Sequence, residues 1–458
     1  MSLISALSYL KPIMNNTIDW LDLPNQPRML LSALQFQFSQ TQSWPPSKLA
    51  SLQLEKARDL LSHATSNTQF YKDREYPIIS NLDEWQQLPI LSRSDVQKHA
   101  ESLHSTSDLT ASHGKTYKLR TSGSTGRPIE VLTSEKAQWF WKAITIRDHL
   151  WHKRNFDEVL AVIKYMGKNK GMSPGLKSKY WGSATATLYN TAPSISLNSS
   201  VDVEEQYQWL VNNKPGYLLT YPSLLKALSE INRQSHNPLS LQHISTIGEN
   251  LTPGLHQLAK ESFGCKPADI YSSQEAGYIA LQCPKHNHYH IQAETTIVEI
   301  LNDQDQPCQP GEMGRVIITP LQNYAMPLIR YEIGDYAIPG KTCDCGINLP
   351  VIEKILGRTR NIVSYPDGKK NWPSYNPMKI MDELPNAQFQ LIQKDLQSIT
   401  LKVATKLTIP LGKEHKIKNI INESMGYNFS ITIEKTDKIS RADTGKYEEF
   451  ISEIENHV

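Results

Sequence analysis

The middle of the chain alternates between strand-like and helix-like segments, and this alternation constrains the fold more than any other feature. Residues 159–164 (VLAVIK) and 244–247 (ISTI) are short and apolar, as buried strands are. Periodic apolar positions predict helices over residues 202–211, 222–231 and 255–263, and a further strand is predicted over residues 268–271. Strands that alternate with helices in this way favour an α/β domain in which helices cover a sheet.

The N-terminal part is predicted to be helical. Residues 1–75 carry helical periodicity, which is clearest over 49–61. We expect them to form the helical N-terminal segment of a large domain whose main part covers residues 76–357. Ser92 or Ser94 can cap a further short helix, because a serine hydroxyl can accept from the free N–H groups at a helix start.

Towards the C-terminus the pattern changes to β-structure. Short β runs within residues 289–340 are interrupted by Asp, Pro and Gly, as in a small barrel or a meander. A polar link follows near residues 357–361, and residues 361–458 are numerous enough for a small separate domain. Alternating runs and one amphipathic helix predict an α+β fold for this domain, with a last helix after residue 446.

The composition excludes several classes of protein. With 458 residues, of which 39% are hydrophobic and 21% charged, the chain can bury a core and form two or three domains. A net charge of +2 argues against nucleic acid or a membrane surface as the main partner, and no apolar run has the length of a membrane span. Five cysteines, a small and odd number, indicate a reducing, cytoplasmic location, and we expect no signal peptide.

Residues 121–128 (TSGSTGRP) are a run of hydroxyls and glycines that ends in a cation and a proline. Backbone N–H groups in such a turn can surround an anion, hydroxyls add donors, and Arg127 adds a positive charge. The run differs from a Walker loop in its spacing and in the short β-like segments that flank it on both sides. Alone, such a run is more often a solvated turn, so its meaning depends on what lies downstream.

Two downstream stretches carry groups that suit nucleotide binding. Residues 271–277 (YSSQEAG) follow a predicted strand, where α/β sheets bind their ligands, and they offer an aromatic face at Tyr271 and a carboxylate at Glu275. These groups suit stacking on a base and holding a magnesium ion near phosphates. Asp335 ends another β-like run and can accept from both hydroxyls of a ribose. A capped helix start and a simple turn are the structural alternatives.

In this order and spacing, the motifs resemble those of the adenylate-forming superfamily of acyl- and aryl-CoA ligases, and more closely its phenylacetate–CoA ligase and capsule-biosynthesis-type branch. The resemblance covers roughly residues 70–450 and rests on TSGSTGRP, YSSQEAG, EMGRVIITPLQNYAMPLIRYEIGD, GRTRN and the C-terminal TGK. It implies an α/β large domain and a small mobile C-terminal domain. It also implies an enzyme that activates a carboxylic acid with ATP as an acyl-adenylate and passes the acyl group to the thiol of CoA.

The resemblance implies a role for individual residues. Lys446 would reach the reacting carboxylate and the α-phosphate, and Glu275 would help to hold Mg²⁺. Tyr271 would stack on the adenine, and Asp335 would bind the ribose with Arg358 close by. The remaining nucleotide-binding positions that it implies are Ser122, Gly123, Ser124, Thr125, Gly126 and Arg127 of the phosphate loop, together with Gly248, Glu249 and Ser272.

Three departures from the family pattern bear on the acceptor. Arg127 replaces the usual lysine, Gln274 replaces the usual hydroxyl, and Arg360 occupies the hinge. CoA is the acceptor that the resemblance favours, and a carrier protein's phosphopantetheine or an amine is the alternative. A non-catalytic scaffold is a further reading. By position in the resemblance, residues 164–191 and 219–223 line the acid pocket, and relatives of this branch often form homodimers.

A second constellation of residues is independent of ATP. Cys283 begins the stretch CPKHNHYH, and Cys343 and Cys345 lie in the stretch CDCG. Three thiols and several imidazoles match a structural Cys₃His zinc site, in which four protein ligands leave no open position for catalysis. By resemblance His290 is the fourth ligand, and His286, at C-x-x-H spacing, is the close alternative. Free thiols with surface histidines are the reading without a metal. The two knuckles span residues 283–290 and 343–346.

Overall fold

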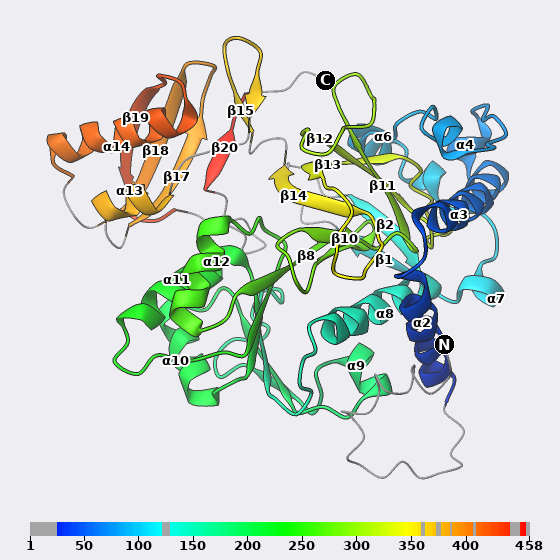
Figure 1. The fold of residues 1–458 in the computed structure, drawn as a ribbon, viewed down its shortest axis with the longest axis horizontal. Coiled ribbons are helices and arrows are strands. Elements are labelled where there is room, and N and C mark those ends of the chain that lie inside the picture. The colour runs from blue at the N-terminus through cyan, green and yellow to red at the C-terminus, as the bar shows by residue number, and fades with distance from the viewer. Residues whose placement is uncertain are drawn as a thin grey trace.

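The computed structural model describes residues 25–120, 129–358, 362–371, 377–384, 387–405, 409–439 and 449–454. It contains a large α/β part and a small α+β part that lie side by side (Figure 1). The mixed α/β class predicted from the sequence is therefore confirmed.

A sheet of 12 strands runs through the large part, in the order β11-β12-β13-β14-β10-β9-β8-β7-β6-β3-β5-β4. Its parallel strands are β3 (Leu160–Lys164), β5 (Ser194–Asn198), β6 (Tyr217–Thr220), β7 (His243–Ile247) and β8 (Pro267–Ser273). The first of them, β3, lies between β5 and β6, so the chain winds outwards in both directions from β3. Sheets of this kind bind ligands beyond the carboxyl ends of their strands. At the edge, β4 (Leu176–Ser178) pairs antiparallel with β5.

The antiparallel part of the sheet continues from the parallel part without a break. Its strands are β9 (Gly277–Gln282), β10 (Tyr289–Ile291), β11 (Thr296–Leu301), β12 (Gly314–Pro320), β13 (Tyr331–Pro339) and β14 (Val351–Arg358). Strands β11 to β14 pair consecutively, which is the meander predicted as one of two alternatives. They do not close into a separate barrel, because β10 pairs with both β9 and β14 and so joins the meander to the main sheet.

Helices cover both faces of the main sheet (Figure 1). Helices α10 (Val203–Asn213), α11 (Pro222–Gln234) and α12 (Pro253–Phe263) share a core with β3, β5, β6 and β7. Helix α8 (Glu135–Trp151), followed by the short α9 (Ser183–Leu188), shares a different core with α2 (Gln26–Thr41), β8 and β9. The predicted helices and strands of the chain's middle are thus present, with boundaries shifted by a few residues.

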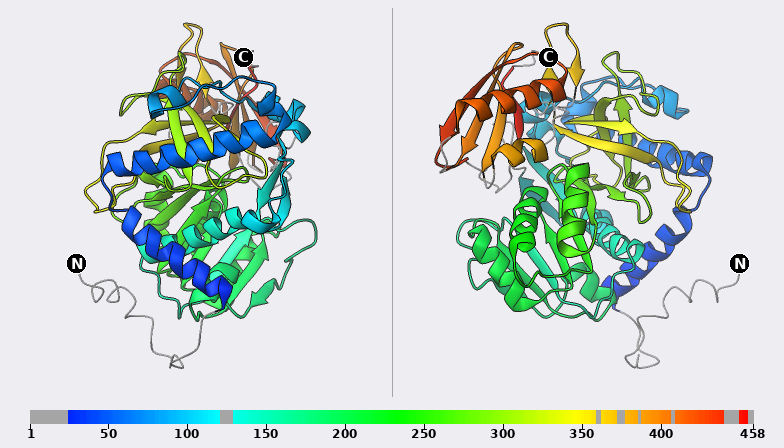
Figure 2. Two further views of the ribbon diagram at one scale, coloured as in Figure 1. Left: turned by 90° about the vertical axis from the view of Figure 1, so that its right-hand side faces the viewer. Right: turned by 60° about the vertical axis from the view of Figure 1, so that its left-hand side comes forward.

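The N-terminal helices wrap around the large part, as Figure 2 shows in blue. In α3 (Pro46–Asn67), Leu49, Ala57, Leu60 and Leu61 are buried, which is the apolar stripe that predicted the helix. Ser92 caps α6 (Arg93–Lys98) through a reciprocal capping box with Asp95. The other short elements are α4 (Gln69–Lys72), α5 (Leu82–Trp85), the 3₁₀ helix η2 (Glu101–Leu103), α7 (Thr110–His113), β1 (Thr116–Arg120) and β2 (Glu130–Ser134).

A buried ion pair fastens α2 and α8 to the sheet. The Arg147 guanidinium donates to both carboxylate oxygens of Glu294, at 2.7 and 3.1 Å, and the Thr41 hydroxyl donates to the same carboxylate at 2.6 Å. Arg147 also donates to the Phe38 carbonyl at 3.1 Å. The two charges compensate each other, although the buried Arg147 Nε has no hydrogen-bond partner among the described residues. Removal of one charge would leave the other buried and without compensation.

The small part contains a four-stranded sheet in the order β19-β18-β17-β20 with two helices. Its elements are β15 (Val363–Ser364), β16 (Lys370–Asn371), α13 (Pro377–Glu383), β17 (Gln388–Gln393), β18 (Ser398–Ala404), α14 (Leu411–Met425), β19 (Ser430–Thr436) and β20 (Phe450–Ser452). The last helix predicted after residue 446 is wrong for residues 450–452, which form β20. Pairing with β17 buries Phe450 in the core of this sheet, and this contact outweighs the helical spacing of the local sequence.

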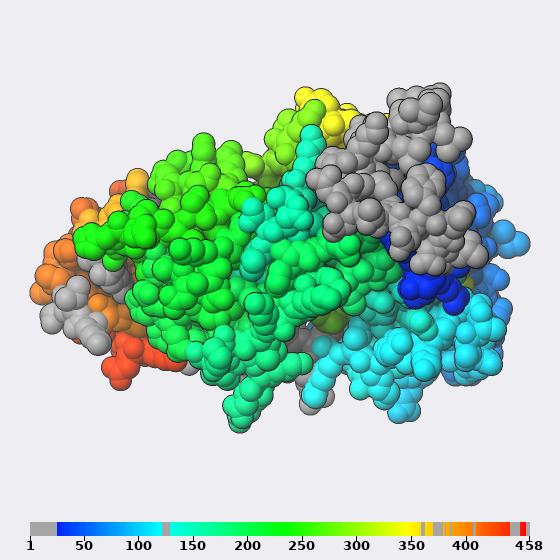
Figure 3. All heavy atoms as spheres, turned by 90° about the horizontal axis from the view of Figure 1, so that it is seen from below, coloured from blue at the N-terminus to red at the C-terminus, as the bar shows by residue number. Residues whose placement is uncertain are grey.

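The space-filling view shows the small part in orange at one end of the molecule, next to the green region that contains α10 to α12 (Figure 3). Among the helices of the described residues, none has the length and apolar character needed to cross a membrane.

Candidate functional site

The ends of β7 and β8 bring several of the predicted nucleotide-binding residues to one edge of the parallel sheet. Gly248 directly follows β7 with a φ of 82°, a left-handed conformation that glycine adopts without strain. The Glu249 carboxylate accepts from the backbone N–H of Ser223 at 2.8 Å and from its hydroxyl at 3.1 Å. It therefore caps the start of α11, where the helix dipole favours a negative charge.

Tyr271, Asp335 and Arg358 meet at the junction of the parallel and antiparallel strands. The Tyr271 hydroxyl donates to Asp335 Oδ2 at 2.8 Å, and Arg358 Nε lies 3.7 Å from Asp335 Oδ1. Asp335 and Arg358 are direct partners in the pairing of β13 with β14. Burial and the nearby Asp335 carboxylate raise the pKa of Tyr271 well above its usual value, so the phenol stays protonated as a donor. Ser272, the next residue of β8, is half-buried at a bulge in the pairing with β9.

Glu275 lies in the tight turn between β8 and β9 and is 7% exposed. The turn is closed by a hydrogen bond from Ala276 N to Ser273 Oγ at 3.1 Å. At Gly277, whose φ is 75°, an added Cβ would lie 1.9 Å from Trp141 Nε1. Glycine is thus required here for two reasons, its backbone conformation and the close approach of the indole. The packing of α8 against this turn fixes the position of Glu275.

A small recess adjoins Glu275, with aromatic and apolar side chains of α8 on one side. Phe140 and Trp141 line it, together with Asn323, which follows β12. Asn323 donates to the Leu132 carbonyl at 2.8 Å, while its Oδ1 is buried and has no partner among the described residues. Sequence reasoning missed this wall, although the run WFW at 139–141, soon after the glycine-rich loop, was a visible signal.

Among the aromatic residues of the expected acid pocket, Trp181 belongs to the core, whereas Tyr165 and Tyr221 lie at the carboxyl ends of β3 and β6. Trp181, within the predicted 164–191 region, is buried against Phe156 and Tyr217 and donates to the Glu158 carbonyl at 2.8 Å. This contact makes it a core residue. Tyr221 accepts from the backbone N–H of Tyr165 at 3.1 Å, close to the carboxyl end of β3.

Several predicted residues lie outside the described residues. They are the phosphate-loop positions Ser122, Gly123, Ser124, Thr125, Gly126 and Arg127, the hinge residue Arg360 and the lysine Lys446. The strands that flank the loop are described, and β1 pairs antiparallel with β2 so that Arg120 faces Glu130. The loop therefore begins and ends at neighbouring points, as a turn between paired strands does.

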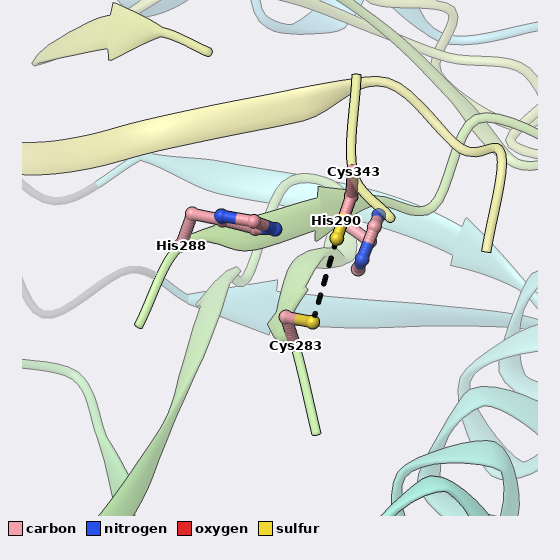
Figure 4. Close-up of side chains that lie close together, drawn as sticks. All are labelled: Cys283, His288, His290 and Cys343. Atoms are coloured by element: carbon pink, nitrogen blue, oxygen red, sulfur yellow. Dashed lines mark hydrogen bonds between the residues drawn. The ribbon is translucent and has the colours of Figure 1, made fainter. Parts of the chain in front are cut away.

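The sulfur and imidazole groups of the two knuckles converge as well (Figure 4). Strand β10 pairs with β14, and this pairing brings the His290 strand next to the loop that carries Cys343 and Cys345. Cys283 Sγ lies 3.9 Å from Cys343 Sγ, and Cys345 Sγ lies 3.3 Å from His290 Nε2. Two sulfurs on a tetrahedral zinc are about 3.8 Å apart, and a sulfur and a nitrogen about 3.5 Å. The spacing of these atoms suits a zinc ion.

Two further observations fit a metal at this cluster. His290 Nδ1 lies 3.2 Å from the Leu349 carbonyl, an arrangement that leaves Nε2 free to bind a cation. Burial lowers the pKa of His290 to about 4 and raises that of the Cys345 thiol to about 12. The imidazole is therefore neutral, as a ligand must be, and a thiolate would need a cation beside it to be stable.

His288 is a candidate that sequence reasoning did not single out. It groups with Cys283, His290 and Cys343, and its Nε2 is buried without a partner among the described residues. His286, the alternative ligand from the sequence, lies at the surface with its Nε2 2.6 Å from Asp344 Oδ1. The structure thus offers five residues for the four ligand positions of a zinc ion, namely Cys283, Cys343, Cys345, His288 and His290. His286 is not among them, because its imidazole pairs with Asp344 at the surface.

Comparisons with known proteins show what the whole chain is similar to. No family model matches the chain. A phenylacetate-coenzyme A ligase of Thermus thermophilus is 27% identical over 168 residues, which are 35% of this chain and 38% of that protein. A phenylacetate-coenzyme A ligase of Pseudomonas putida is 22% identical over 335 residues, or 68% of this chain and 71% of that protein. The match thus spans less than two-fifths of the Thermus relative and about seven-tenths of the Pseudomonas one.

Among solved structures, 2-hydroxyisobutyryl-CoA ligase in its postadenylation state with 2-HIB-AMP gives a TM-score of 0.70 at 15% identity, over 96% of this chain and 95% of that one. The fold is that of the adenylate-forming CoA ligases. For the same ligase with 2-HIB-AMP and CoA, the thioesterification state gives a TM-score of 0.59 and an open conformation gives 0.57. Of these three states of 2-hydroxyisobutyryl-CoA ligase, the postadenylation state is thus the one to which this chain is most similar.

Proposed function

We propose that this protein is an ATP-dependent carboxylate–CoA ligase that works through an acyl-adenylate. The contact of Tyr271 with Asp335 and Arg358, beside Glu275 at the sheet edge where α/β folds bind ligands, carries this proposal. The similarity to phenylacetate-coenzyme A ligases and the adenylate-forming fold support it.

The reaction proceeds in two displacement steps. A carboxylate oxygen of the acid attacks the α-phosphorus of ATP, and the bond to the bridging oxygen breaks so that pyrophosphate leaves. The sulfur of CoA, having lost its proton to a base or to solvent, then attacks the acyl carbon, and AMP leaves with the bonding pair. Two anions must meet in the first step, so we assign Lys446 to the carboxylate and α-phosphate oxygens and Arg127 to the departing pyrophosphate.

The described geometry supports the nucleotide roles that we propose. Asp335 accepts from the ribose hydroxyls through the carboxylate that Tyr271 and Arg358 hold in place. The Tyr271 ring offers the adenine an aromatic face, and Gly248, Glu249 and Ser272 border it at the ends of β7 and β8.

Glu275 is the residue that we assign to Mg²⁺. Its side chain is largely buried, and carboxylate oxygens suit a hard cation such as Mg²⁺. Mg²⁺ supplies charge neutralisation to the phosphates when it is bound. The unpartnered Oδ1 of Asn323, on the same recess, offers a second oxygen in this neighbourhood.

We assign the side of α8 that faces the Glu275 turn to the acid. Phe140 and Trp141 line a recess there whose volume is about 20 Å³, which is room for one water, so the acid must displace these side chains to bind. Their aromatic rings favour a flat or compact apolar acid over a charged one. This assignment replaces the interior of residues 164–191, where Trp181 belongs to the core.

The cysteine–histidine cluster is proposed to hold a structural zinc ion. Cys283, Cys343, Cys345 and His290 are the ligands that we assign, with His288 rather than His286 as the alternative. The ion would tie the turn after β9 to the loop before β14, and four protein ligands would leave it no open position for catalysis. None of the five cysteines forms a disulfide, in keeping with a cytoplasmic location.

The test is ATP–pyrophosphate exchange across a panel of carboxylic acids, followed by assay for a CoA thioester. We expect exchange that depends on one acid class, with thioester formed when CoA is added. Binding of ATP without exchange for any acid would favour a scaffold. Exchange without thioester would move the acceptor to a carrier protein or an amine.

Lys446→Ala should abolish exchange while ATP still binds, and unchanged exchange would remove its assigned role. Whether the enzyme is a homodimer stays a prediction for solution-mass measurement.

A further inference from the structure

One ion pair joins the large and small parts across their interface. Lys226 Nζ, on α11, lies 2.5 Å from Glu449 Oε1, in the residue that precedes β20. Each of the other ion pairs between described residues lies entirely within the large part or entirely within the small part, so the Lys226–Glu449 pair is the one that connects them. Figure 1 shows α11 next to the β17–β20 side of the small sheet.

This contact is more than a flexible surface pair. Both side chains are 22% exposed, and the Lys226 ammonium also lies 5.6 Å from the ring centroid of Phe389 in β17. The Glu449 carbonyl accepts from Leu391 N at 2.8 Å, so the backbone of Glu449 is fixed on the small sheet. Partial burial and a second contact make such a pair stronger than an exposed one.

The pair is close to the proposed catalytic lysine in the sequence and to the candidate nucleotide site in space. Glu449 is three residues after Lys446, so their Cα atoms can be at most about 11 Å apart. Lys226 is three residues after Ser223, the residue capped by Glu249, which is about 4.5 Å along the helix. The Lys226–Glu449 pair therefore holds the start of β20 near the beginning of α11, which Glu249 caps.

A second acid provides a way to release the pair. Glu230 is four residues after Lys226 on α11, within reach of the same ammonium. Its Oε1 is buried and has no partner among the described residues. If the small part turns away, Lys226 can exchange Glu449 for Glu230, so its charge is not left uncompensated. Such an exchange lowers the cost of separation and suits a contact that must form and break in each cycle.

We propose that Lys226 and Glu449 are positioning residues that hold the small domain in the orientation for adenylate formation, and that Glu230 takes over Lys226 when the small domain leaves. This inference rests on the proposed function. The greater similarity to the postadenylation state of 2-hydroxyisobutyryl-CoA ligase than to its thioesterification state supports it.

The test separates the two half-reactions. Lys226→Met and Glu449→Gln should slow acid-dependent ATP–pyrophosphate exchange by roughly three- to fivefold. They should leave thioester formation from supplied acyl-adenylate and CoA unchanged or faster. The double reversal K226E/E449K should restore much of the exchange. Lys394→Met, which removes an ion pair with Glu453 inside the small domain, is the matched control and should change neither step.

Glu230→Gln supplies an independent arm. It removes the second acceptor for Lys226, so thioester formation should slow while exchange stays at the wild-type rate. Equal losses in both half-reactions for K226M, or exchange at the wild-type rate in that variant, would overturn the proposal.

If wild-type protein shows no exchange with any acid, the proposed function itself fails. The distance between spin labels on α12 and α14 then decides the positioning claim: it should broaden in K226M, and an unchanged distribution would reject it.

Discussion

The Tyr271 hydroxyl donates a 2.8 Å hydrogen bond to Oδ2 of Asp335, so the aromatic face and the carboxylate assigned to one nucleotide are held as a single unit. The two residues come from β8 and β13, which are 64 positions apart in the chain. The other carboxylate oxygen of Asp335, Oδ1, lies 3.7 Å from Arg358 Nε. A change at either residue should therefore alter ATP binding, but by different amounts.

Tyr271→Phe keeps the ring and removes the donor, so we expect the KM for ATP to rise by about fivefold, the worth of one hydrogen bond. Asp335→Asn removes the charge that accepts from the ribose, and the expected rise is roughly 10- to 150-fold. ATP titration of the pyrophosphate-exchange rate measures both. Deoxyadenosine triphosphates should lose less affinity in Asp335→Asn than in wild type. An equal loss of affinity in wild type and in Asp335→Asn would contradict the assignment of Asp335 to the ribose.

Glu275→Gln should raise the Mg²⁺ concentration needed for half-maximal exchange by about tenfold or more. The amide keeps the shape of the buried side chain but removes the negative charge that attracts the cation. Magnesium titration at saturating ATP is the measurement, with circular dichroism to show that the turn between β8 and β9 is intact. Glu261→Gln, at an exposed acid of α12, is the control. A normal magnesium requirement in Glu275→Gln would exclude Glu275 as a ligand.

Local patterns predicted much of the fold because their information is local. The strands predicted over residues 159–164 and 244–247 agree with β3 and β7 to within one residue, since a short apolar run bounded by polar residues defines a buried strand. The order of the strands was not predictable, because it depends on pairing between distant segments. The strand around Phe450 was missed for this reason, as its apolar spacing also suits a helix and only β17 decides between them.

The same limit applies to the candidate sites. Residue types in the motifs identified Tyr271, Asp335 and the cysteines, but their contacts depend on how β10 links the two halves of the sheet. His288 was missed because its nearness to the cluster follows from the turn that a hydrogen bond from Cys283 N to the His288 carbonyl closes. The wall formed by Phe140 was missed because the packing face of α8 is a tertiary property.

Purified protein should contain one zinc ion per chain by elemental analysis. Cys343→Ser and His290→Ala should lose the metal and unfold at a lower temperature, since the ligands close a site between two loops. His286→Ala should keep the zinc because its imidazole pairs with Asp344 at the surface. The fourth ligand is either Cys345 or His288, and of the variants Cys345→Ser and His288→Ala, the one that loses zinc identifies it. Cys265→Ser, at an unrelated thiol, is the control, and a metal-free but equally stable wild type would remove the proposal.

Asp269 gives a prediction for the dependence of stability on pH. Burial raises its pKa to about 7, although the hydroxyls of Thr246 and Tyr289 donate to its two oxygens. Its protonated form therefore stabilises the fold fully below about pH 4, and this contribution is lost as the pH rises through 7. Asp269→Asn mimics the neutral acid, so its unfolding free energy relative to wild type should increase between pH 5 and 8 in urea titrations. Asp303→Asn, at an exposed acid, should show no such trend, and parallel curves for wild type and Asp269→Asn would contradict the prediction.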